Sequence, residues 1–310
     1  MSRRGWVLFA LLSVIWGIPY LLIRIAVRDI APPTLVFFRT APAAIAFLPF
    51  VLKKDTLIGL RTHWRAVVVY TVGEVCIPWL LLFRSEQRIP SSLAGLLIAT
   101  VPLIAVIWAW ITRHDSRLDW KRLAGLVLGF AGVAVLVGVD VHGSDLIAVG
   151  EVGIVAIGYA ISPFIVSRYL SEIPAIGVVG ASFVLASLVY SPVALTHLPK
   201  RLSPEEITSV IILVVVCTAA AFLVFFALIG EVGPTRATVV TYINPAIAVV
   251  LGVAILHEHF TLGFAVGVPL VLLGSFLGTG GGREPAAEPD AETNGIDPQT
   301  ARGGLTALGS

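Results

Sequence analysis

The chain has 310 residues, of which 57% are hydrophobic and only 13% are charged, and its formal net charge is +2. A soluble globular protein carries about 25% charged residues, so this composition excludes an ordinary soluble domain. The small net charge and the lack of a basic stripe argue against nucleic acid as a partner. The sequence therefore predicts an all-α integral membrane protein in contact with the lipid bilayer.

Ten apolar stretches follow one another along the chain, separated by charged or proline-rich breaks. Each approaches the length of about 20 residues that a transmembrane helix needs. The first is too long for a signal peptide and no small-residue cleavage site follows it, so we expect it to be retained. The ten stretches are residues 6–27, 33–52, 66–83, 91–111, 122–139, 146–167, 174–195, 207–230, 235–256 and 262–278.

The loops differ in their content of lysine and arginine. Most of these residues fall in loops on the same side as the N-terminus, and such a bias marks the cytoplasmic side. We therefore expect a multi-pass protein of the cytoplasmic membrane with both termini in the cytoplasm. The tail, residues 279–310, is rich in Gly, Pro, Ala and Glu, and this composition predicts a disordered segment.

The chain matches itself when one copy is moved along the other by a constant offset, which we call the repeat shift. The matching pairs are Trp16 with Tyr159, Pro49 with Pro192, Ala94 with Ala237, Pro102 with Pro245, and His114-Asp115 with His257-Glu258. This predicts two five-helix repeats, residues 1–140 and 141–278. Because five is odd, the second repeat enters the membrane in the opposite orientation, an architecture typical of secondary transporters with a midplane substrate site.

Two charged residues lie inside apolar stretches. Glu74 is close to the middle of the third stretch and Arg39 lies in the second. A carboxylate at the bilayer centre costs about 2.5–3.5 kcal/mol on insertion scales. Their depths differ by about one helical turn, so the side chains could meet. Glu74 would bind a proton or a substrate amine, with Arg39 as its counter-ion or as a clamp for a substrate carboxylate. The alternative is a structural ion pair that fixes helix register.

Aromatic residues of the first stretch are further candidates for a substrate site. Trp16 and Tyr20 lie four residues apart on one helix face, and Tyr159 is the repeat counterpart of Trp16. Aromatic walls with a polar tip suit an amphipathic solute. The other reading is that these rings only pack against neighbouring helices.

Prolines mark two expected bending points. Pro102 and Pro245 each remove a backbone hydrogen bond inside an apolar stretch, so a kink is expected there. Asn244 precedes Pro245. Its amide could contact a solute or bond to a neighbouring helix.

Several glycines and both cysteines are predicted to serve helix packing. Gly125, Gly129 and Gly132 allow helices to approach closely, within one chain or in a homodimer. Cys76 and Cys217 lie in apolar stretches, where a disulfide is not expected.

No pattern indicates catalysis, a metal or a cofactor. His257 and His259 lie two residues apart around Glu258, whereas two histidines that share a helix face around zinc need a spacing of four. The sequence contains no Gly-x-x-x-x-Gly-Lys phosphate-binding loop. We therefore expect no metal, no cofactor and no catalytic residues.

Several motifs together carry a family resemblance. They are Ser13-Val14-Ile15-Trp16-Gly17 and Arg39, then Val101-Pro102, then Tyr242-Ile243-Asn244-Pro245 and Leu256-His257-Glu258-His259-Phe260-Thr261, and finally Gly267 and Gly274. With these residues the chain resembles the drug/metabolite transporter superfamily and, within it, the EamA-type family of ten-span bacterial carriers. One departure is Arg113-His114-Asp115-Ser116-Arg117, where the family usually has a Gly-Glu-Arg-like turn.

The resemblance implies a function in transport. We expect a secondary active transporter that exports or exchanges small metabolites, amino acids or drug-like compounds by alternating access, with Glu74 as the candidate for proton coupling. A membrane-embedded lipid-modifying enzyme is the alternative, although such an enzyme usually needs a cluster of His, Asp or Glu near one interface. A passive channel is a third reading.

Overall fold

The computed structural model describes residues 2–112, 119–141, 143, 145–233 and 237–279, and every regular element in these ranges is a helix. The first half contains α1 (Arg3–Gly17), α2 (Pro19–Ala26), α3 (Pro32–Val51), α4 (Lys54–Thr62), α5 (Trp64–Thr71), η1 (Val72–Cys76), α6 (Ile77–Ser85), α7 (Ser91–Ile98), α8 (Val101–Ile111) and α9 (Trp120–Asp140). The second half contains α10 (Asp145–Tyr169), α11 (Ala175–Thr196), α12 (Pro204–Val214), η2 (Val215–Ala220), α13 (Ala221–Val232), η3 (Thr238–Tyr242), α15 (Asn244–Leu256) and α16 (Leu262–Gly278).

Within the described ranges, nine helical stretches are long and apolar enough to cross a membrane. They are Arg3–Ala26, Pro32–Val51, Trp64–Ser85, Ser91–Ile111, Trp120–Val139, Asp145–Tyr169, Ala175–Thr196, Pro204–Val232 and Val239–Leu256. The tenth predicted stretch is the apolar helix α16, which at 17 residues is shorter. The predicted all-helical fold is confirmed for the described residues, whereas the count of ten spans is met only if α16 is included.

Irregular helix turns occur at matching places in the two halves. The π-helical segment η1 begins at Val72, and the π-helical segment η2 begins at Val215, the position that the repeat shift pairs with Val72. Similarly, α8 begins at Val101 and α15 begins at its repeat counterpart Asn244, each with a proline in its first turn. The repeat shift found in the sequence thus recurs in the positions where the helices are interrupted.

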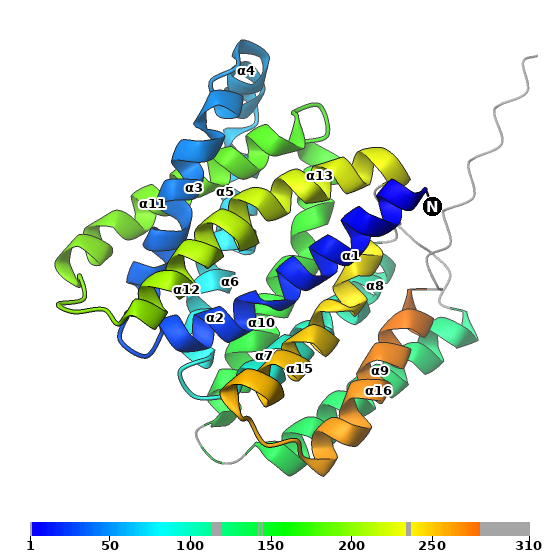
Figure 1. The fold of residues 1–310 in the computed structure, drawn as a ribbon. Helices are drawn as coiled ribbons and strands as arrows, with labels where there is room; N and C mark the ends of the chain where they lie inside the picture. The colour runs from blue at the N-terminus through cyan, green and yellow to red at the C-terminus, as the bar shows by residue number, and fades with distance from the viewer. Residues whose placement is uncertain (1, 113–118, 142, 144, 234–236, 280–310) are drawn as a thin grey trace, which may run out of the picture.

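The helices pack in pairs that combine the two halves (Figure 1). Helix α3 lies against α11, α9 against α16, and α7 against α15. Helix α1 packs on α13, and α10 packs on α6. Exchanging each span for its repeat counterpart leaves this set of paired spans unchanged, which is what two related halves facing each other would produce.

The glycines of α9 pack within this chain. A side chain at Gly125 would meet the backbone of Gly274 and Gly278 in α16, and one at Gly132 would meet Leu270 and Val271. Gly129 lies against Leu103 of α8 in the same way. These glycines are therefore used for contacts between α9 and its neighbours, and a homodimer stays a prediction.

We expect Gly125→Val to destabilise the protein, because the added side chain pushes α9 away from the α16 backbone. Overpacking of this kind costs about 1–3 kcal/mol. The matched control is Gly138→Val in the same helix, where a side chain would meet nothing within 4 Å. The measurement is the melting temperature of the purified protein. Equal melting temperatures for the two variants would contradict the packing.

Candidate functional site

Arg39 lies at the centre of the bundle, on α3. Only 8% of the residue is exposed. Its Nε donates a hydrogen bond of 2.9 Å to the hydroxyl of Thr218 in η2, and its guanidinium carbon lies 3.9 Å from the centroid of the Trp79 ring. The charge is therefore held by one hydrogen bond and one aromatic face.

The π-helical segment η2 prepares the contact to Arg39. The hydroxyl of Thr218 donates to the carbonyl of Leu213, five residues earlier, at 2.8 Å. Its oxygen then accepts the hydrogen bond from Arg39. π-Helical turns occur frequently at functional sites, and here the turn orients a hydroxyl toward a buried cation.

The Nη atoms of Arg39 have no hydrogen-bond partner among the described residues, since its side-chain bond uses Nε. A guanidinium offers five N–H donors in a planar fork. The Nη side of this fork, which suits a carboxylate, therefore makes no hydrogen bond to the described residues.

The expected contact between Arg39 and Glu74 is wrong. The described residues contain no ion pair between them, and Arg39 is instead engaged with Thr218 and Trp79. Glu74 lies within η1, where the π-helical turn changes the direction of its side chain relative to a regular helix. It faces Ser162 of α10, whose hydroxyl makes no hydrogen bond of ordinary geometry.

Two predicted tyrosines interact electrostatically with these charges. Tyr159 is within electrostatic reach of both Glu74 and Arg39. Tyr20 is within reach of Arg39 on one side and of Glu86 on the other. We call these five side chains, which influence one another electrostatically, the central polar group.

Aromatic rings surround the central polar group. Trp16 packs against Phe225 at a centroid distance of 4.9 Å and against Phe222 at 6.2 Å. Trp79 contacts Phe183 at 5.8 Å, and Phe183 contacts Phe222 at 5.7 Å. Trp16 is only partly buried, so its ring packs on α13 and also keeps an accessible face.

Asn244 is used in part for helix packing. With its amide oriented to satisfy its hydrogen bonds, its nitrogen donates to the carbonyls of Val240 at 3.0 Å and Ser13 at 3.1 Å. The second bond ties the start of α15 to α1. The two prolines lie at helix interruptions: Pro102 in the first turn of α8 and Pro245 in the first turn of α15.

A second cluster of polar residues, centred on Glu258, lies at the end of the bundle where α2, α6 and α15 end. The Glu258 carboxylate accepts hydrogen bonds from the backbone N–H groups of Ser91 at 2.7 Å and Ser92 at 3.0 Å. The hydroxyls of the same serines also donate to it, at 2.9 and 2.5 Å. Glu258 thus holds the first turn of α7, where a negative charge also suits the helix dipole.

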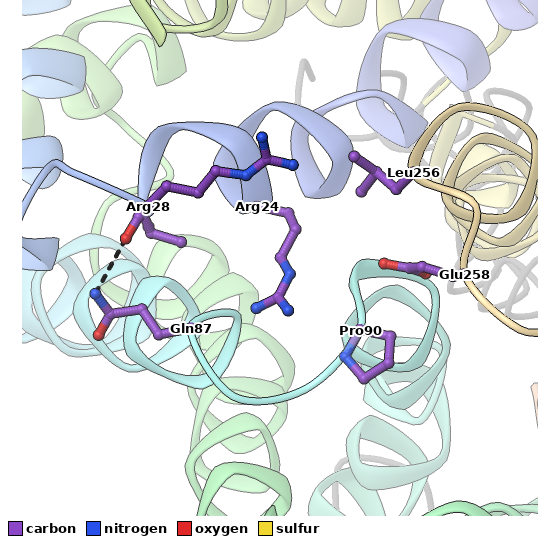
Figure 2. A pocket seen from close by; sticks show the side chains of 7 residues that line it. Arg24, Arg28, Gln87, Pro90, Leu256 and Glu258 are labelled. Carbon is purple, nitrogen blue, oxygen red and sulfur yellow. Dashed lines mark hydrogen bonds between the residues drawn. The ribbon is translucent and has the colours of Figure 1, made fainter. Parts of the chain in front are cut away.

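A cavity of about 500 Å³ opens beside Glu258 (Figure 2). Arg24 reaches into it from α2, and an Nη of Arg24 donates to the backbone carbonyl of Glu86. The Nε2 of Gln87 donates to the carbonyl of Val27 at 3.2 Å. The residues that line the cavity are Arg24, Val27, Arg28, Gln87, Pro90, Leu256 and Glu258.

Sequence reasoning missed Glu86, Trp79 and Thr218. Trp79 could have been found, because the repeat shift pairs it with Phe222 and both rings face the same centre. Thr218 and Glu86 could not have been found from the sequence. A single threonine in an apolar stretch is common in membrane helices, and a charged residue between two apolar stretches is typical of an exposed turn. His114 and Asp115, the departure from the family motif, lie outside the described residues.

Comparison with known proteins gives a family match over nearly the whole membrane part. The profile of the EamA-like transporter family matches residues 3–138 and again residues 150–279. The chain is 30% identical over 288 residues to the uncharacterized inner membrane transporter YedA of Escherichia coli (strain K12), covering 87% of this chain and 90% of that protein. It is 24% identical over 282 residues to the uncharacterized transporter YvbV of Bacillus subtilis (strain 168), covering 87% and 90%.

Two further similarities concern function and fold. A probable amino-acid metabolite efflux pump of Escherichia coli (strain K12) is 22% identical over 296 residues, covering 89% of this chain and 95% of that protein. A solved crystal structure superposes with a TM-score of 0.64 at 19% identity, covering 90% of this chain and 98% of that chain. The latter shows a shared fold.

Proposed function

The chain belongs to the EamA-like transporter family, and from this premise we propose that it is a secondary active transporter that exports or exchanges small carboxylate-bearing metabolites of the amino-acid type. It works in the cytoplasmic membrane by alternating access between the two halves. The family and the transporter names of its relatives favour a carrier over a lipid-modifying enzyme. Another relative is named a probable amino-acid metabolite efflux pump.

The Nη side of the Arg39 fork carries the proposal. Arg39 is buried, its Nε is fixed by Thr218 and its plane is covered by Trp79. A guanidinium held in this way is positioned to donate two hydrogen bonds from its Nη atoms to a carboxylate, the geometry in which arginine binds carboxylates most strongly. Arg39 forms no ion pair with the described residues. A solute carboxylate would act as its counter-ion.

Glu74 supplies the opposite charge in the central polar group. Tyr159 is within electrostatic range of both Glu74 and Arg39. A zwitterion with its carboxylate on Arg39 would direct its amine toward Glu74. The apolar part of the solute would lie against Trp16, Tyr20 and the surrounding rings.

Proton coupling is the second role of Glu74. A carboxyl group that binds either a proton or a substrate amine makes the two ligands compete, which is the requirement for exchange of protons against solute. Asn244 would contribute its carbonyl oxygen to the same solute, since its nitrogen bonds to α1.

Alternating access follows from the relation between the halves. The recurring helix interruptions and the paired packing support two inverted five-helix repeats, with α16 as the last span. The breaks beside Pro102 and Pro245 give each half a point at which a span can bend. The excess of basic residues on one side supports cytoplasmic termini.

The test is transport by the full chain in liposomes loaded with a mixture of amino acids and their decarboxylated amines. Under an imposed pH gradient, mass spectrometry follows which solutes leave. We expect saturable loss of a few amino acids and little loss of the matching amines. Liposomes without protein give the background, and equal loss of acids and amines would contradict carboxylate recognition.

We expect Glu74→Gln to remove the effect of the pH gradient while solute exchange without a gradient remains measurable. The reason is that glutamine keeps the size of the side chain but cannot release a proton. The control is Glu205→Gln, an exposed carboxylate in the first turn of α12. An unchanged response to the gradient in Glu74→Gln would exclude this residue from coupling.

A further inference from the structure

Glu86 is a buried carboxyl group with no role in the site described so far. It follows Ser85 directly, one residue beyond the third span, and caps the end of α6. None of its surface is exposed. Neither of its carboxylate oxygens has a hydrogen-bond partner among the described residues.

An ionised carboxylate in such a place is strongly unfavourable. Burying a charge without a hydrogen bond or a counter-ion costs so much that the group takes up a proton instead. A neutral carboxylic acid loses less on burial. The geometry therefore favours the protonated form in this conformation.

The charged and titratable neighbours of Glu86 form no hydrogen bond with its carboxylate among the described residues. Arg24 from α2 donates to the backbone carbonyl of Glu86, not to its carboxylate. Glu258, beyond α15, is held by the two serines of α7. Arg39 from α3 bonds to Thr218, and the fourth neighbour is Tyr20. Burial raises the pKa of the Glu86 carboxyl well above its usual range; Arg24 lowers it, Glu258 raises it further and Arg39 lowers it.

Glu86 does not itself line the cavity, but its chain neighbour Gln87 and its hydrogen-bond partner Arg24 do. The cavity has a volume of about 500 Å³, and Arg24 and Gln87 project into it (Figure 2). Tyr20 and Arg39 of the central polar group are within electrostatic reach of Glu86. The basic-residue bias assigns the cavity to the outer face of the membrane. A proton released from Glu86 would have to pass Arg24 and Gln87 to reach the cavity.

We propose that Glu86 is a proton-binding site distinct from Glu74, which holds a proton in this conformation and exchanges it through the cavity. On release, the O–H bond of the carboxyl breaks and the proton passes to water in the cavity. The carboxylate that remains is stabilised when Arg24 turns from the carbonyl to the carboxylate. The inference deepens the proposed function, but the protonation of Glu86 is measured without any transport.

The first test is infrared spectroscopy of the full chain in liposomes near pH 7, with wild type and Glu86→Gln compared. We expect the difference spectrum to show loss of a carbonyl band of a protonated carboxylic acid, and this band shifts in D₂O because the proton exchanges through the cavity. The control is Glu151→Gln. Glu151 is also buried but its Oε1 lies 3.1 Å from Arg84, so this variant loses carboxylate bands instead. Loss of carboxylate bands in Glu86→Gln would overturn the proposal.

The second test is thermal stability at several pH values. Because the pKa of Glu86 is raised in the folded protein, the unfolded chain releases this proton first as pH rises, and stability falls until the folded pKa is passed. We expect the melting temperature of wild type to fall more between about pH 5 and about pH 8 than that of Glu86→Gln or Glu86→Leu. Parallel curves, or variants that fold only at acidic pH, would overturn the proposal.

Discussion

Replacing Arg39 by glutamine is expected to lower the efflux of carboxylate-bearing solutes by about 100-fold. A charge-assisted hydrogen bond contributes about 1.5–3 kcal/mol, and a factor of 100 corresponds to about 2.8 kcal/mol. Transport of the matching amines is expected to change little, because they make no contact with the guanidinium. The measurement is the initial rate of efflux of paired acids and amines from liposomes.

Arg39→Lys is expected to recover only part of this loss. Lysine keeps the charge but lacks the planar fork that binds both carboxylate oxygens. Thr218→Val removes the partner of Nε without changing size or charge, so the guanidinium loses its orientation and we expect a decrease of about tenfold, or about 1.4 kcal/mol.

An arginine at the surface provides the matched control for Arg39. Arg61, in the last turn of α4, is exposed, so Arg61→Gln is expected to leave transport nearly unchanged. Equal losses for acids and amines in Arg39→Gln would show that this residue acts through the structure and not through a solute carboxylate.

Much of the architecture was predictable because bilayer thickness and hydrophobicity fix helix length. The boundaries of spans such as Pro32–Val51 and Ser91–Ile111 lie within a residue of the predicted stretches. The constant offset was visible in the sequence because helix interruptions need particular residues, as at Pro102 and Pro245. Helix interruptions recur at this offset in the structure, and the division into two five-helix repeats stays a prediction.

The details of the site were less predictable. Composition and spacing do not reveal that η1 and η2 are π-helical, because a π-helical turn depends on tertiary contacts. The predicted depths of Arg39 and Glu74 did not determine which neighbours their side chains face, and in the structure Arg39 bonds to Thr218 while Glu74 faces Ser162. The residues that contact the Arg39 guanidinium are Thr218 and Trp79, which come from spans eight and three.

Glu86 shows a different limit of sequence reasoning. It lies in a turn with Arg84, Gln87 and Arg88, a composition typical of an exposed loop. Its burial arises because the turn folds against α2, as the bonds of Gln87 to Val27 and of Arg24 to Glu86 indicate. Contacts between segments so far apart in the chain leave no periodic pattern in either segment.

Glu258→Ala is expected to produce the largest loss of stability of the changes considered. The carboxylate accepts four hydrogen bonds from Ser91 and Ser92, which are 0% and 1% exposed. Without it, two backbone N–H groups in the first turn of α7 are buried without a partner, and each costs about 1–3 kcal/mol. We expect a loss of about 3 kcal/mol, seen as a fall in melting temperature on the order of 10 °C.

The position of Glu258 depends on the backbone at the end of α15. His257 adopts a left-handed conformation with φ of 55°, which turns the chain so that Glu258 N–H bonds to the carbonyl of Gly252 at 3.1 Å. A side chain at Gly252 would meet the Glu258 carboxylate and Ser91. His257→Gly is expected to keep or raise stability, because glycine adopts this conformation without steric cost.

Two comparisons separate the loss of this particular contact from the loss of a negative charge. Glu231 is exposed and accepts a hydrogen bond from Ser2, so Glu231→Ala is expected to leave the melting temperature nearly unchanged. Glu258→Gln keeps one oxygen as an acceptor but turns an NH₂ group toward donors, so an intermediate loss is expected. If Glu258→Ala melts like wild type, α7 is not held by this carboxylate, and the packing of α7 on α15 has to be stabilised by apolar contacts alone.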